Sequence, residues 1–194
     1  MKRVFVGGSR RVSRLNEDIK ARLDSIVEQR CLVLVGDANG ADKAAQRHFH
    51  ELGYQSVIVF CVEESCRNNV GDWEFQRVTP PHERKDLDFF SAKDRVMAKE
   101  ADYGFMIWDT KSAGTVLNVG RLVSDNKIAV IYRVSDKRFI EIQGASDFES
   151  LMSGCPAKLR SKVENQLKSE GLLTGAQADL FPKETIDGSL QRKP

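Results

Sequence analysis

Three turns rich in glycine and serine each follow a short apolar run in this chain. They are Gly7–Arg10, Gly36–Asp42 and Asp109–Thr115. Such turns bring backbone N–H groups and helix N-termini, which carry partial positive charge, up to a phosphate or a sugar. Because the carboxyl ends of parallel strands meet at one edge of a sheet, we expect the three turns to form one ligand site.

Phosphate binding is the best-supported chemistry at the first and third turns. The first combines backbone donors, a hydroxyl and a guanidinium, and its residues are Gly7, Gly8, Ser9 and Arg10. The third places hydroxyls and N–H groups at the positive end of a predicted helix, through Ser112, Gly114 and Thr115. The alternative is that both are tight connections without a ligand, since glycine and serine are what turns require.

Three aspartates near these turns are candidates for acid–base catalysis, namely Asp42, Asp94 and Asp109. Any of them could act as an acid or base if burial raised its pKa. Asp109 stands at the carboxyl end of a predicted strand, whereas Asp102 is expected in the turn before it. His48 and His50 are two residues apart on a predicted helix and so face different sides, and we expect no metal site.

Composition and cysteine spacing narrow the class of protein. A net charge of +2 over 194 residues is too small for a surface that coats nucleic acid. No apolar run approaches transmembrane length and no signal peptide is visible, so a cytoplasmic protein is expected. The four cysteines, Cys31, Cys61, Cys66 and Cys155, are interpreted as buried thiols in a reducing compartment. A metal site on Cys61 and Cys66 would need a further ligand such as His82.

The turns need a scaffold, and the apolar pattern predicts one. Five short runs lack apolar–polar alternation, as strands covered on both faces do: Arg3–Val6, Cys31–Val35, Ser56–Cys61, Tyr103–Trp108 and Ile128–Tyr132. Segments with apolar residues at helical spacing separate these runs, and Ile19, Leu23 and Ile26 are one example. We therefore predict an α/β fold with a doubly wound, mostly parallel, Rossmann-like sheet of about five core strands.

Several local features complete this prediction. Asn39 is the expected N-cap of the second helix, with Asp42 as its partner, and Gly53 is the expected stop. The connection 62–90 has no sustained periodicity of apolar residues. We interpret it as a partly ordered flap beside the ligand site or at an oligomer interface. Arg138–Gln143 is a possible edge strand and Ala157–Ser169 a charged helix. We expect a Rossmann-like domain over 1–155, then a helix and tail over 156–194.

The order of these motifs resembles the SLOG superfamily, which includes the DprA and LOG proteins. The resemblance covers about Met1–Tyr132 and rests on Gly-Ser-Arg, Gly-x-x-x-Gly-Ala-Asp and Trp-Asp-x-x-Ser-x-Gly-Thr, each after a strand. It implies a Rossmann-like fold that binds a nucleotide or a nucleotide derivative. The matching positions that it assigns to the ligand are Gly7, Gly8, Ser9, Arg10, Gly36, Gly40, Asp42, Lys93, Asp94, Asp109, Ser112, Gly114 and Thr115.

The chain departs from this family at three places. Asp37 stands where a second glycine is common, which favours contact with a sugar hydroxyl or base there over a bare phosphate, since like charges repel. Lys93-Asp94 replaces an Arg-Asn pair. The LOG branch has a glutamate after Gly-Thr that assists N-glycosidic cleavage, whereas Val116, Leu117 and Asn118 follow here, and an amide cannot be a general base.

The tail carries a second resemblance. Gln177-Ala178-Asp179-Leu180-Phe181 is similar to the peptide with which bacterial replication proteins dock on the sliding clamp. Gln177 would fix the register while Leu180 and Phe181 enter an apolar pocket. The alternative is that these apolar residues pin the tail to the domain.

Three functions follow from the sequence as hypotheses. The leading one is binding of a nucleotide or nucleotide-derived small molecule by a sensor or accessory protein. The second is an enzyme that hydrolyses or transfers an N-glycosidic bond. The third is an accessory protein of DNA metabolism tethered to the clamp. A homo-oligomer is possible, and no membrane partner or further cofactor is expected.

Overall fold

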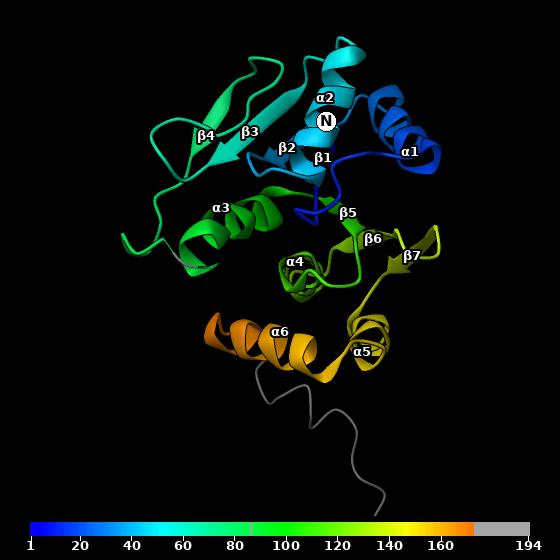
Figure 1. The fold of residues 1–194 in the computed structure, drawn as a ribbon, viewed down its shortest axis with the longest axis vertical. Coiled ribbons are helices and arrows are strands. Elements are labelled where there is room, and N and C mark those ends of the chain that lie inside the picture. The colour runs from blue at the N-terminus through cyan, green and yellow to red at the C-terminus, as the bar shows by residue number, and fades with distance from the viewer. Residues whose placement is uncertain (86, 173–194) are drawn as a thin grey trace, which may run out of the picture.

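The computed structural model describes residues 1–85 and 87–172, which form one seven-stranded sheet with helices on both faces (Figure 1). The predicted clamp-docking residues Gln177, Leu180 and Phe181 lie outside these described residues. The strand order is β4-β3-β2-β1-β5-β6-β7. No helix in the described part of the chain is both long and apolar enough to cross a membrane.

The sheet confirms the predicted doubly wound topology. Its strands are β1 (Arg3–Gly8), β2 (Leu32–Gly36), β3 (Val57–Cys61), β4 (Phe75–Arg77), β5 (Tyr103–Trp108), β6 (Ile128–Arg133) and β7 (Arg138–Ile142). All neighbouring pairs are parallel except β6 and β7, which are antiparallel. The five predicted core strands and the predicted edge strand are therefore present. β4 was not predicted, because three residues with no buried side chain give no apolar pattern.

Two hydrophobic clusters cover opposite faces of the sheet. The helices are α1 (Glu17–Glu28), α2 (Ala41–Glu51), α3 (Leu87–Glu100), α4 (Ala113–Ser124), α5 (Ala145–Ser153) and α6 (Ala157–Ser169). Val4 and Val6 of β1 pack in one cluster with α1 and α2, whereas Phe5 packs in the other with α3 to α6. Successive side chains of a strand point to opposite faces of the sheet, and both faces are covered. The central strands are therefore continuous apolar runs in the sequence.

α4 lies between the sheet and the C-terminal helices (Figure 1). Its Gly120 lets α6 approach closely, because a Cβ there would lie 2.7 Å from Leu167 Cδ1 and 2.9 Å from Phe148 Cζ of α5. Leu159, Val163 and Leu167 of α6 join the same cluster as α3 and α4. The predicted division at residue 155 stays a prediction, and α6 packs directly on the Rossmann-like core.

Helix termini follow the predicted chemistry at two of three positions. Ser112 is the N-cap of α4, and Gly53 follows α2 with a φ of +66°. Asn16, which was not predicted as a cap, caps α1. The prediction that Asn39 caps α2 was wrong. Gly40 occupies that position without a side-chain bond, and Asn39 Oδ1 instead accepts a hydrogen bond from Asn68 Nδ2 at 3.1 Å.

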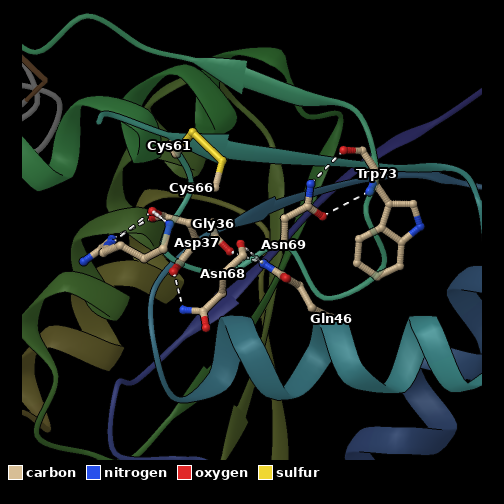
Figure 2. Close-up of a disulfide and its surroundings, with 9 residues drawn as sticks. Gly36, Asp37, Gln46, Cys61, Cys66, Asn68, Asn69 and Trp73 are labelled. Carbon is tan, nitrogen blue, oxygen red and sulfur yellow. Dashed lines mark hydrogen bonds and ion pairs between the residues drawn. A yellow bond between two sulfur atoms is a disulfide. The ribbon is translucent and has the colours of Figure 1, made fainter. Parts of the chain in front are cut away.

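The prediction of four free thiols was wrong for two of them. Cys61 at the end of β3 forms a disulfide with Cys66 in the following loop, with their Cα atoms 5.3 Å apart (Figure 2). The loop turns back directly after the strand, which brings the two residues within disulfide range. Cys31 and Cys155 are free and buried, as predicted.

We expect this disulfide to stabilise the fold by about 2 kcal/mol, because it closes a short loop in the unfolded chain. Chemical unfolding with and without a thiol reductant measures this. The reductant should lower the unfolding free energy of the natural protein and leave that of Cys61→Ala/Cys66→Ala unchanged. Equal stability of the natural protein in both conditions would contradict the prediction.

Candidate functional site

A cavity of about 490 Å³ opens at the carboxyl ends of β1 and β5. The chain winds from β1 toward β4 in one direction and from β5 toward β7 in the other, so the loops after β1 and β5 diverge at this point. Eighteen residues from both halves line it: Phe5, Gly7, Gly8, Arg10, Arg11, Ala38, Asp42, Lys85, Phe90, Ser91, Lys93, Asp94, Asp109, Lys111, Ser112, Gly114, Thr115 and Asn118. Most of the sequence-predicted residues therefore meet here.

The loop before α4 is held by Asp109. Its Oδ1 accepts the N–H groups of Lys111 at 2.9 Å and Ser112 at 2.8 Å, and also the hydroxyl of Ser9 at 2.9 Å. Burial alone would raise the pKa of Asp109, but these donors outweigh it and the pKa is lowered. Asp109 therefore stays ionised and shapes the loop, which suits it poorly to proton transfer.

Ser9 joins the two loops that flank the cavity. It is fully buried, and its Oγ also accepts the N–H of Asp109 at 3.0 Å and lies 3.3 Å from Thr115 Oγ1. Its backbone N–H donates to Ile107 O of β5. Ser9 does not line the cavity, so its contacts hold the β1 loop against the β5 loop.

The N-terminus of α4 keeps two backbone donors for a ligand. Ser112 Oγ accepts the N–H of Thr115 at 3.4 Å. The N–H groups of Ala113 and Gly114 have no hydrogen-bond partner among residues 1–85 and 87–172. A Cβ at Gly114 would meet only Ser112 Oγ, at 4.0 Å, so the space in front of these donors is open. This is the arrangement that binds anions at helix N-termini.

Close backbone packing under the cavity requires glycine in the first turn. A Cβ at Gly8 would overlap the carbonyl oxygen of Ile107 in β5 and lie 2.9 Å from the Cβ of Ala41. The N–H of Gly8 donates to Asp42 Oδ1 at 3.3 Å. Gly8 therefore lets β1, β5 and α2 meet at one point.

Asp42 and Lys93 form the buried part of the cavity. Asp42 is 6% and Lys93 4% exposed. Burial raises the pKa of Asp42 to about 6, although Lys93 acts in the opposite direction. Burial would lower the pKa of Lys93, but the negative charges of Asp94 and Asp42 outweigh burial, so the pKa of Lys93 is raised. Gly36 gives both side chains room, because a Cβ there would lie 2.5 Å from Asp42 Oδ2 and 2.7 Å from Lys93 Nζ.

Asp94 is held by donors on two sides. Lys93 Nζ donates to its Oδ1 at 2.8 Å, and Asn118 Nδ2 donates to its Oδ2 at 3.3 Å. Burial would raise the pKa of Asp94, but the charges of Lys93 and Arg121 outweigh it and the pKa is lowered. Asp94 therefore presents an ionised, acceptor-only carboxylate to the cavity.

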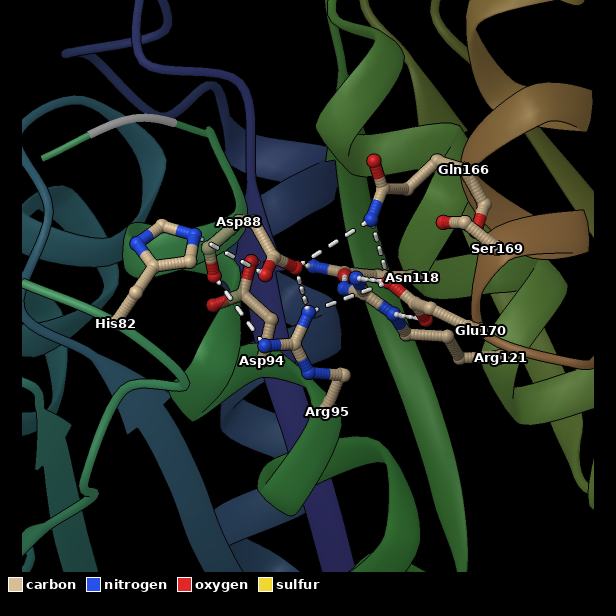
Figure 3. Close-up of polar contacts among 9 residues, drawn as sticks. All are labelled: His82, Asp88, Asp94, Arg95, Asn118, Arg121, Gln166, Ser169 and Glu170. Atoms are coloured by element: carbon tan, nitrogen blue, oxygen red, sulfur yellow. Dashed lines mark hydrogen bonds and ion pairs between the residues drawn. The ribbon is translucent and has the colours of Figure 1, made fainter. Parts of the chain in front are cut away.

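A chain of polar contacts runs from Asp94 to the end of α6 (Figure 3). Asn118 Oδ1 accepts from Arg121 Nη1 at 2.7 Å. Arg121 makes a bidentate pair with Glu170, at 2.8 Å from Nε and 2.6 Å from Nη2. Arg121 is 3% exposed, so this pair fixes α4 to α6 away from water. This pair could not be predicted from the sequence, because the partners are 49 residues apart.

Exposed cations surround the opening of the cavity. We call Arg10, Arg11, Lys85 and Lys111 the cationic rim. With Lys93, five cationic side chains line the cavity against the three carboxylates of Asp42, Asp94 and Asp109, and one of the five, Lys85, also forms an ion pair with Glu63 outside the cavity. The cavity therefore favours an anionic ligand, with its positive charge at the opening and its carboxylates deeper.

Asp37 does not line the cavity as its position in the family pattern suggested. It is fully buried and accepts from Arg67 Nη2 at 2.6 Å, Arg67 Nε at 3.0 Å and the N–H of Arg67 at 3.1 Å. Burial would raise its pKa, but Arg67 outweighs it and the pKa is lowered. The Arg67 guanidinium also lies 5.0 Å from the centroid of Phe90, which lines the cavity.

The loop that carries Arg67 is tied to the turn after β2 (Figure 2). Asn68 Nδ2 donates to Asp37 O at 2.7 Å, and Gln46 Nε2 donates to Gly36 O at 2.9 Å. Gly40 has a φ of +88°, and a Cβ there would overlap the backbone of Arg10. Gly36, Asp37 and Gly40 thus shape the walls of the site and do not line the cavity.

Three contributors were missed in the sequence. Phe90 and Lys85 come from the connection 62–90, which lies beside the cavity as one of its two interpretations expected. Arg10 contacts Phe90 with its guanidinium 5.6 Å from the ring centroid. Asn118 was noted only as the residue that replaces a glutamate. Phe90 and Lys85 are distant from the glycine turns along the chain, whereas Asn118 is four residues after Gly114 but carries no motif of its own.

Comparison with solved structures places this fold among known ones. DNA processing protein A (DprA) from Streptococcus pneumoniae superimposes with a TM-score of 0.54 at 15% identity, over 79% of this chain and 57% of that one. DprA from Helicobacter pylori, described with a single-stranded DNA binding mode, gives a TM-score of 0.47 at 16% identity, over 87% of this chain and 81% of that one. This chain thus spans just over half the length of the S. pneumoniae protein.

These likenesses concern the fold. No protein-family model matches the chain, and no curated protein matches its sequence. The DprA-like, Rossmann-like fold that the SLOG resemblance implied is confirmed by the S. pneumoniae structure.

Proposed function

We propose that this protein binds a nucleotide or a nucleotide-derived phosphate ester in the cavity between β1 and β5. The observation that carries the proposal is the open N-terminus of α4. The N–H groups of Ala113 and Gly114 are without partners in the described chain, and Gly114 lines the cavity. A phosphate there would accept these hydrogen bonds and interact favourably with the helix dipole.

Size and charge support a phosphate with an organic group attached. A cavity of about 490 Å³ is within the range of small-molecule sites and far larger than a phosphate alone requires. The cationic rim attracts the phosphate, while Asp42 and Asp94 repel it from the deeper part. The remainder of the ligand therefore needs hydrogen-bond donors, which the hydroxyls of a sugar and the amino group of a base supply.

Gly114→Asp tests this placement of the phosphate. The added carboxylate would take the position of the anion, and we expect binding of a nucleoside monophosphate to weaken at least 30-fold. The fold should persist, because the site has room and an acidic residue in the first helical turn is favourable by about 0.5 kcal/mol. Titration calorimetry measures the affinity, and a thermal melt checks the fold.

Two controls isolate the effect. Gly114→Asn adds a side chain of the same shape without its charge, and we expect it to retain most of the binding. Gly144→Asp adds the same charge at the start of α5, where nothing lies within 4 Å of the new Cβ. Unchanged binding by Gly114→Asp, or equal losses in all three variants, would overturn the proposal. Competition by a single-stranded oligonucleotide that exceeds the mononucleotide would assign the site to nucleic acid.

Asp42 supports a second candidate function, hydrolysis or transfer at an N-glycosidic bond. It lines the cavity and has a pKa of about 6, which suits an acid or base near neutral pH. Asp109 and Asp94 fit that role less well, because donors hold both in the ionised form. Release of free base from nucleoside monophosphates, lost in Asp42→Asn, would support this function. If the natural protein releases no free base, binding without catalysis remains as the proposed function.

A further inference from the structure

We infer that the cavity recognises the ribose of its bound nucleotide, and that Asp94 does so by accepting a hydrogen bond from the 2′ or the 3′ hydroxyl. This inference rests on the proposed function, since it takes the phosphate to lie at the N-terminus of α4. It adds the class of sugar and the residue that recognises it.

The spacing along α4 supports this assignment. Asn118 is four residues after Gly114, so both lie on one face of the helix, about 6 Å apart along its axis. Asn118 fixes the Asp94 carboxylate at that depth through the 3.3 Å bond from its Nδ2. In a 5′-nucleotide, five covalent bonds separate the phosphorus from the 3′ hydroxyl oxygen, which is a comparable span. A phosphate on Gly114 would therefore place the ribose hydroxyls near Asp94.

The chemistry of Asp94 fits a hydroxyl and excludes a phosphate. Lys93 and Arg121 keep it ionised, so each of its oxygens can only accept hydrogen bonds. Lys93 and Asn118 use one acceptor position on each oxygen, and further positions remain. A hydrogen bond from a neutral hydroxyl to an ionised carboxylate is among the stronger kinds.

Arg121 and Glu170 act as positioning residues for this contact. Arg121 Nη1 donates a hydrogen bond to Asn118 Oδ1. This bond orients the Asn118 amide so that its Nδ2 faces Asp94 (Figure 3). Glu170 holds Arg121 with two hydrogen bonds and is itself contacted by Gln166 and Arg95. The last turn of α6 thereby fixes the orientation of a carboxylate in the cavity.

The experiment compares adenosine 5′-monophosphate with its 2′-deoxy and 3′-deoxy forms by titration calorimetry. We expect the natural protein to bind at least one deoxy form tenfold or more weakly. Asp94→Asn should reduce that ratio to about one. Glu170→Gln, which lies outside the cavity, should reduce it in part. Asp136→Asn removes a surface carboxylate that pairs with Arg133, and it should leave the ratio unchanged.

The outcomes separate this inference from the proposed function. Phosphate-dependent binding with equal affinity for all three sugars would overturn the inference and leave the proposed function intact. A ratio that persists in Asp94→Asn would assign the selection to another residue and also overturn it. Binding that does not depend on the phosphate would remove the premise, and both would fail.

Discussion

Gly8→Ala should destabilise this protein by about 3 kcal/mol or more. The new Cβ would overlap the carbonyl oxygen of Ile107, and it would also press on Ala41. Neither neighbour can move alone, because Ile107 belongs to a central strand and Ala41 begins α2. Chemical unfolding of the two proteins measures the difference.

Gly114→Ala is the matched control for this prediction. It makes the same change at a glycine with open space around it, inside the first turn of α4. Alanine has the higher helix propensity, so this variant should be equally or slightly more stable than the natural protein. Similar stability for Gly8→Ala would show that β1 and β5 do not pack as described.

Asp42→Asn should remove a pH dependence of stability worth about 3 kcal/mol. The pKa of Asp42 is raised from 3.8 to about 6 in the folded protein. The stabilising contribution of its proton is complete below the unfolded pKa and is lost as the pH rises through 6. The unfolding free energy of the natural protein should therefore fall relative to that of the variant, mostly between about pH 4 and pH 6.5.

The difference between the two proteins isolates Asp42. Asp37, Asp94 and Glu170 have lowered pKa values and contribute the opposite pH dependence, but they are present in both chains. Urea unfolding of both proteins across this pH range gives the difference directly. A difference that stays constant with pH would show that Asp42 titrates normally and is not buried beside Lys93.

The sequence predicted the scaffold well because the scaffold follows from local patterns. Continuous apolar runs identified the central strands, and glycine and serine after β1 and β5 identified the two loops that flank the cavity. Ser112 was recognisable as a helix N-cap from its type and place. Each of these signals lies within about ten residues, where periodicity and turn chemistry operate.

The remainder of the site depends on partners distant in sequence. Asp37 was expected near the ligand, but Arg67, 30 residues later, binds it in the wall. The pair of Arg121 and Glu170 likewise has no local pattern. The prediction of free thiols at Cys61 and Cys66 was wrong because the loop after β3 brings the two residues together. Tertiary contacts such as those of Gln46 and Asn68 set the direction of that loop.

The most direct test of the central claim is a calorimetric titration of the natural protein with adenosine 5′-monophosphate and with adenosine, at low and at high salt. We predict that the monophosphate binds at least 30-fold more tightly than the nucleoside. Salt should weaken only the monophosphate, because the cationic rim and the N-terminus of α4 recognise its charge. Equal affinities for the two compounds, or no binding of either, would contradict a phosphate site between β1 and β5.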